Sequence, residues 1–163
     1  MRKTSLLLAV AAVFGITATS VQAAPATEPY NASVVILKQL TIAENTPLSF
    51  GKVDLAKSGD SVFTVAPNGT PTVTGTDASF ITPPVAGAFT VNGSGDQSVK
   101  LTEKEGLCSV STVLLTGLTL STETVTLNAI SGDATFTLGG TVTVPAGTAA
   151  GTVTCAYELT AAY

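Results

Sequence analysis

The sequence contains no histidine and no tryptophan, and only 11% of its 163 residues are charged. Without imidazole, neither a Ser-His-Asp triad nor a Cys-His pair can form. Metal sites that depend on histidine ligands are excluded for the same reason. We therefore predict a protein that is not an enzyme and that carries no metal and no cofactor.

Positive charge is also scarce. After residue 23 the chain has no arginine, and five lysines stand against eleven acidic residues, which gives a net charge of −6. Nucleic acids and anionic lipids attract basic patches, and this part of the sequence offers none. We therefore expect neither nucleic acid nor an anionic membrane surface as a partner.

The single long apolar run lies at the N-terminus. Met1-Arg2-Lys3 is positively charged, residues 6–16 are apolar, and Val21-Gln22-Ala23 places small residues where a signal peptidase cuts. The alternative interpretation is a membrane anchor, but the apolar run is too short to span a bilayer easily. We predict a signal peptide over residues 1–23, export to the periplasm, the cell surface or the extracellular space, and no transmembrane segment in the mature chain.

The mature chain divides into a short leash and one domain. Residues 24–32 contain Pro25 and Pro29 and little apolar content, so they are expected to be extended. Residues 33–163 consist of short runs rich in threonine and valine, separated by glycine, proline or asparagine. This pattern predicts an all-β fold, an antiparallel immunoglobulin-like β-sandwich of about ten short strands.

Local signals place the turns of this sandwich. Asn68-Gly69 and Asn92-Gly93 are each typical of a hairpin turn between two strands. Gly139-Gly140 separates two further predicted strands, over residues 134–138 and 141–144. Glu103 and Glu105 are the only closely spaced acid pair, and we interpret them as part of a solvated hairpin loop.

Only two cysteines are present, Cys108 and Cys155. Each lies on an alternating pattern, so both are expected to point inward. In an oxidising compartment two thiols in a small domain usually pair, and we predict a disulfide. Two buried, unpaired thiols are the alternative.

The first alternating run covers residues 33–42. Val34, Ile36, Leu40 and Ile42 share one face, and Lys38 interrupts the row. Such a segment can add to the open sheet edge of another molecule, so these four residues are candidates for strand donation. The alternative is that the run is the first strand of its own domain.

Three segments carry a resemblance to a known family: Leu48-Ser49-Phe50-Gly51, residues 86–93 and residues 139–147. Together they resemble a family of exported bacterial β-domains of unknown function. That family is similar in size and layout to pilus subunits assembled by a chaperone and an usher. Both cysteines lie in the second half of the chain, which departs from the pattern of those subunits.

The resemblance implies a structural or adhesive surface component, a pilus-like subunit that assembles by strand addition. Its implied partners are copies of itself or related subunits, together with a periplasmic chaperone. A soluble, monomeric ligand-binding module is the alternative function, and a preformed pocket with convergent polar groups would favour it.

Overall fold

The computed structural model describes residues 29–163, so the predicted signal peptide and most of the predicted leash lie outside the described residues. Residues 29–163 contain eleven strands and no helix. This part of the chain therefore has no helix that could cross a membrane. The strands are β1 (Thr41–Thr46), β2 (Val53–Asp54), β3 (Ser61–Val65), β4 (Pro71–Thr74), β5 (Ser79–Phe80), β6 (Gly87–Asn92), β7 (Ser98–Cys108), β8 (Leu114–Leu120), β9 (Thr124–Thr126), β10 (Asp133–Val144) and β11 (Cys155–Ala162).

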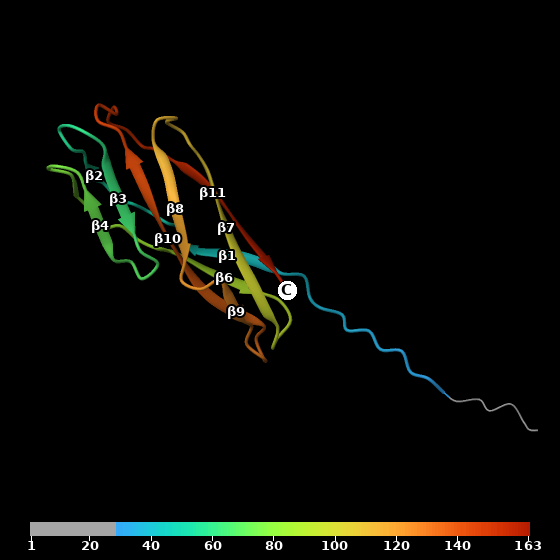
Figure 1. Ribbon diagram of the computed structural model, residues 1–163. Helices are drawn as coiled ribbons and strands as arrows, with labels where there is room; N and C mark the ends of the chain where they lie inside the picture. The colour runs from blue at the N-terminus through green and yellow to red at the C-terminus, as the bar shows by residue number, and fades with distance from the viewer. Residues whose placement is uncertain (1–28) are drawn as a thin grey trace, which may run out of the picture. The chain divides into compact units, whose positions relative to one another are not determined.

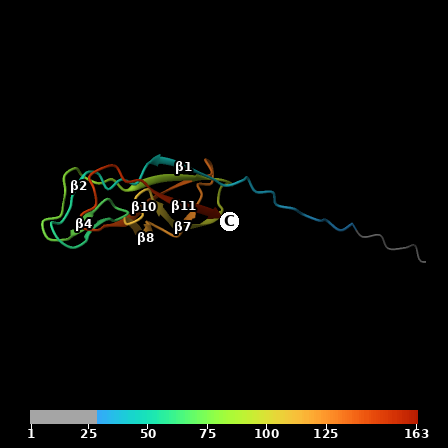
Figure 2. The same cartoon turned by 90° about the horizontal axis from the view of Figure 1, so that it is seen from above.

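All the paired strands run antiparallel, which confirms the predicted all-β, antiparallel class. The larger sheet has the order β1-β6-β10-β3-β4, with β8 pairing the other edge of β10. A second sheet has the order β11-β7-β9, and β2 pairs with β5. In both views β2 and β4 lie at the end of the domain away from the C-terminus (Figures 1 and 2).

The inward faces of both sheets contribute to one cluster of eleven buried side chains, which we call the closed core. Along β6 and β7 the buried residues alternate with more exposed ones, as expected for strands with one face toward the core. The closed core consists of Phe89, Val91, Val99, Leu101, Leu115, Leu118, Leu120, Val125, Leu127, Phe136 and Leu138.

A smaller cluster lies around β3 and the second half of β10. Only four of its residues are buried, and nine others pack against them while staying partly exposed. We call this cluster the open core. Its buried members are Phe63, Val113, Val142 and Val144.

One glycine pair differs from its predicted role. Gly139 and Gly140 do not separate two strands but lie inside the twelve-residue strand β10. A Cβ on Gly139 would collide with the carbonyl oxygen of Val65, so glycine allows a close approach of backbones here. Asn68-Gly69, by contrast, forms the predicted hairpin between β3 and β4, with Gly69 at a φ of 81°.

The predicted hairpin at Asn92-Gly93 is wrong. β6 pairs with β1 and β10, whereas β7 belongs to the other sheet, so the chain crosses between sheets after Asn92. The amide of Gly93 donates to the carbonyl oxygen of Gly132 at 2.8 Å. A Cβ on Gly93 would come within 2.7 Å of a Leu40 methyl group. This glycine therefore serves close packing rather than a two-residue turn.

The predicted loop around Glu103 and Glu105 is also wrong, because both residues lie within β7. Lys104 forms an exposed ion pair with Glu158 of β11 at 3.4 Å. Glu105 accepts a hydrogen bond from the backbone amide of Leu118 at 3.3 Å. Glu103 and Glu105 lie on the same face of β7 as the buried Val99 and Leu101, whereas Lys104 lies on the opposite face. The spacing of these charged residues alone did not distinguish a strand from a turn.

Candidate functional site

The domain has an open, mostly apolar cavity of about 820 Å³ beside the open core. Its wall is formed by β2 and the preceding loop, the second half of β10, the start of β8, and the segment leading into β11. Most of its lining side chains are hydrophobic: Leu48, Phe50, Val53, Leu55, Ile81, Val113, Leu115, Val142, Val144, Ala149, Ala150, Val153, Cys155 and Tyr157.

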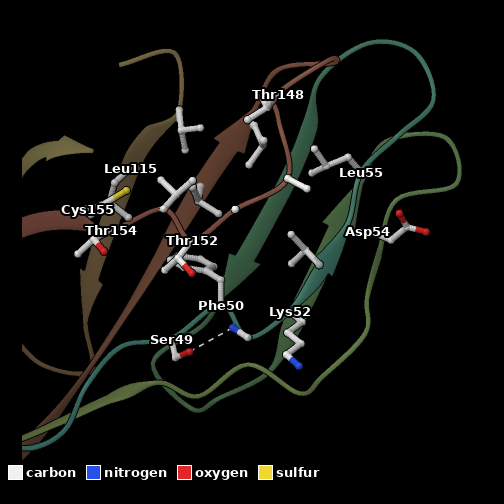
Figure 3. Close-up of a pocket in the computed structure, with 18 of the residues that line it drawn as sticks. Ser49, Phe50, Lys52, Asp54, Leu55, Leu115, Thr148, Thr152, Thr154 and Cys155 are labelled. Carbon is white, nitrogen blue, oxygen red and sulfur yellow. Dashed lines mark hydrogen bonds between the residues drawn. The ribbon is translucent and has the colours of Figure 1, made fainter. Parts of the chain in front are cut away.

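The close-up shows how these walls are arranged (Figure 3). Leu115 and Cys155 lie on one side of the cavity and Leu55 lies on the other, while the side chain of Asp54 points away (Figure 3). Lys52 and Asp54 are the only charged residues in its lining. The cavity therefore suits an uncharged, apolar occupant.

The cavity is open because regular strands do not cover the open core. β2 is only two residues long, and residues 145–154 form turns and irregular backbone before β11 begins. β11 is the edge of its sheet, since it pairs with β7 and has no other strand partner among residues 29–163. Its inward-facing residues, from Cys155 to Ala161, all remain partly exposed.

Tyr157 sits where β11 meets this cavity. Its hydroxyl donates to Oε1 of Glu44 in β1 at 3.0 Å. Burial raises the pKa of Tyr157 to about 12, and the hydrogen bond to Glu44 and the negative charge of that carboxylate add to the effect. The phenol is therefore neutral across the physiological range, and its ring is an apolar part of the cavity wall.

The predicted disulfide between Cys108 and Cys155 is confirmed. The two residues lie directly opposite each other where β7 pairs with β11. Both pack against the closed core and the open core. The covalent bond therefore fixes the end of β11 that borders the cavity.

The four strand-donation candidates fall into two pairs. Leu40 and Ile42 pack against the closed core of their own domain, and Ile42 lies in β1 opposite Val91 of β6. Val34 and Ile36, in contrast, are 82% and 86% exposed and belong to no strand. The first strand begins at Thr41 rather than at residue 33, so the predicted run divides at Leu40.

Lys38 marks the point where the chain joins its domain. Its backbone amide donates to Oγ of Ser94 at 2.7 Å, and its carbonyl oxygen accepts from the Tyr163 hydroxyl at 2.6 Å. The same hydroxyl accepts from the amide of Ser94 at 2.7 Å. Lys38, which interrupts the apolar row in the sequence, is thus held by its backbone at the C-terminal end of β11.

No acidic or cysteine cluster in the described part of the chain could hold a metal ion. Glu103 and Glu105 share a face of β7 with the buried Val99 and Leu101, and neither carboxylate lines the cavity. The geometry combines an apolar wall with a strand edge that has no strand partner among the described residues. In strand-addition complexes of other proteins, such features bind extended peptides by side-chain burial and backbone hydrogen bonds.

Sequence reasoning missed the cavity itself. Phe50, which lines the cavity, also packs against both the closed core and the open core. Ile81 has no periodic context at all. Whether an apolar residue is covered depends on which strands reach it, and no local pattern in the sequence reports that.

Most of the domain matches a known protein family. Residues 40–163 match the model of a family described as a domain of unknown function (DUF4402), and the chain belongs to that family. The exposed residues Val34 and Ile36 precede the matched region. No curated protein and no solved structure matches this chain.

Proposed function

We propose that this member of the DUF4402 family is an exported structural subunit, and that one copy donates its N-terminal segment, residues 29–37, to another copy. Val34 and Ile36 are the donated side chains. Leu40 and Ile42, the other two candidates, stay with their own domain and anchor the segment. The subunit would act as a structural or adhesive surface component and would carry out no catalysis.

The proposal depends on the exposure of three consecutive apolar side chains in the N-terminal segment. Val34, Val35 and Ile36 each have more than 80% of their surface exposed. A single exposed aliphatic residue is ordinary, but three in succession on extended backbone match a segment that gains stability only when another surface covers it.

Export is consistent with the disulfide and with the N-terminal sequence. A disulfide between neighbouring strands persists in the periplasm or outside the cell and is rare in the cytosol. An exported chain also encounters other copies of itself, which a self-assembling subunit requires.

The cavity supports a second candidate function, that of a ligand-binding module, because about 820 Å³ is within the range of small-molecule sites. Such sites combine apolar walls with a few convergent polar groups that orient the ligand. Here Lys52 is the one lining residue that supplies a cation, and Asp54 points outward (Figure 3). The lining therefore favours an apolar peptide segment over a polar small molecule.

The test compares the exported full chain with the variant V34S/V35S/I36S. We expect the wild-type chain to form oligomers in sedimentation velocity and the triple variant to remain monomeric. The melting temperature should be unchanged, because the three side chains are exposed in the single chain.

The matched control is Ile130→Ser, which removes an isoleucine that is 98% exposed in the loop before β10. This variant should assemble like the wild type. A wild-type chain that stays monomeric at high concentration, or a triple variant that assembles normally, contradicts the proposal.

A further inference from the structure

We infer that the cavity beside β11 is the acceptor for the N-terminal segment of a second copy, which adds as a strand along the free edge of β11. This inference rests on the proposed function, because it names the surface that receives the donated segment. The occupant is residues 29–37 of another molecule of this chain, with Val34 and Ile36 directed into the cavity.

The cavity and the N-terminal segment are two uncovered, apolar surfaces of one chain. The cavity has apolar walls and only two charged residues in its lining. The segment from Ser33 to Leu37 carries no charge and includes four aliphatic residues. Each surface lacks an apolar partner to cover it, and the other surface on a second copy provides one.

Strand β11 has a free edge beside the cavity. β11 pairs with β7 on one side only, and its inward-facing side chains remain partly exposed. An added strand would satisfy the free backbone groups of β11 and cover Cys155 and Tyr157, which line the cavity.

The donated segment is also long enough. Nine extended residues, 29–37, span about 30 Å, and the eight residues of β11 span about 26 Å. The segment is long enough to follow the whole strand. In extended backbone Val34 and Ile36 point to the same side, so both can enter one cavity while Val35 faces outward.

The position of Lys38 explains why the occupant comes from a second copy. Tyr163 holds the Lys38 carbonyl at the C-terminal end of β11, whereas the cavity borders its Cys155 end. Val35 and Ile36, which lie three and two residues before this anchor, are exposed in the single chain and do not fill its cavity.

The donor and acceptor surfaces are different, so the contact is heterologous. Each subunit would donate one segment and accept one, and such a contact extends into a filament unless the rotation between subunits closes a ring. A closed two-fold dimer is not expected from this geometry.

The test uses a charge placed in the cavity wall. Ile81 lines the cavity but is 64% exposed, so Ile81→Glu should leave the melting temperature of the single chain nearly unchanged. Covering an unpaired carboxylate by an apolar strand is unfavourable, and we expect binding to weaken at least about tenfold. The probe is a labelled peptide of residues 29–40, added to the V34S/V35S/I36S chain and followed by fluorescence anisotropy.

Two further variants complete the design. Thr152→Glu introduces the same charge at another exposed residue of the cavity and should also weaken binding. Ile130→Glu introduces it at an exposed isoleucine that does not line the cavity, and should leave peptide binding at the wild-type level.

A mixing experiment separates this inference from the proposed function. V34S/V35S/I36S lacks a donor but keeps its cavity, and Ile81→Glu keeps its donor. Neither alone should form chains, and an equimolar mixture should form a one-to-one dimer. If the wild type assembles and the triple variant does not, but Ile81→Glu and Thr152→Glu assemble normally, the acceptor assignment is wrong and the proposed function stands.

Hydrogen exchange distinguishes strand addition from simple filling of the cavity. Peptide binding should slow the exchange of those β11 amides that face away from β7. Binding that leaves these amides unprotected would identify an apolar ligand site without an added strand, and would overturn the inference.

Discussion

The two cores of the domain differ in how completely they are covered. In the closed core, strands from both sheets surround eleven buried side chains, whereas the open core has four buried residues and borders the cavity. The β-rich sequence is similar in both regions. The difference is therefore one of strand coverage, and it indicates that the first region stabilises the fold while the second is available to a partner.

The disulfide lies between these two regions, and its removal should have the largest effect. It closes a loop with a sequence separation of 47, for which loop entropy predicts a loss of about 4 kcal/mol in the free energy of unfolding. Urea denaturation of the variant C108S/C155S measures this loss, and the reduced wild-type chain is the control. A loss below about 1 kcal/mol would show that β7 and β11 hold together without the bond.

A pair of leucine substitutions compares the cores directly. Leu138 is fully buried in the closed core, and Leu138→Ala should lower the free energy of unfolding by about 3 kcal/mol, since burial is lost and a cavity remains. Leu55 is only partly buried beside the open core, so Leu55→Ala should lower it by about 1 kcal/mol.

Chemical denaturation of both variants gives the comparison, with the wild type as reference. Equal losses would contradict the distinction between the cores. Saturation with the peptide of residues 29–40 should increase the penalty of Leu55→Ala and leave that of Leu138→Ala unchanged.

The sequence predicted the all-β class and the disulfide because both follow from local properties. Alternation along Ser61–Val65 and Gly87–Asn92 indicates strands with one buried face, and the only two cysteines of the sequence have only each other as partners. Asn68-Gly69 was located correctly for the same reason, since its turn depends on the conformation of two residues.

The wrong predictions concern residues whose structural role is set by tertiary contacts. Gly139 allows β10 to approach Val65, and Gly93 packs against Leu40 and the Tyr163 hydroxyl, so neither glycine has the turn role that its neighbours suggested. The division of the first apolar run at Leu40 likewise depends on β6 and Tyr163. Contacts between residues 38 and 163 leave no local signal in the sequence.

The smallest expected effect concerns Tyr157, at the boundary between the closed core and the cavity. The folded chain raises the pKa of Tyr157 to about 12, whereas in an unfolded chain the phenol has its ordinary pKa of 10.0. Because the folded state keeps the proton longer, this residue's contribution to stability is fully present below pH 10. It is lost as the pH rises from 10 to 12. The difference in the free energy of unfolding between the wild type and Tyr157→Phe should therefore be constant up to pH 10 and shrink above it.

Glu44→Gln separates the causes of this shift. Burial is the largest cause and the Glu44 carboxylate a smaller one, so this variant should keep most of the raised pKa, measured by the NMR shift of the Tyr157 Cζ carbon. A pKa that returns to about 10 in Glu44→Gln would mean that the ring is solvated and that the cavity wall is more open at β11 than its burial indicates. Peptide bound along β11 should raise the pKa further, because an added strand excludes water from the phenol, and an unchanged pKa would place the peptide elsewhere.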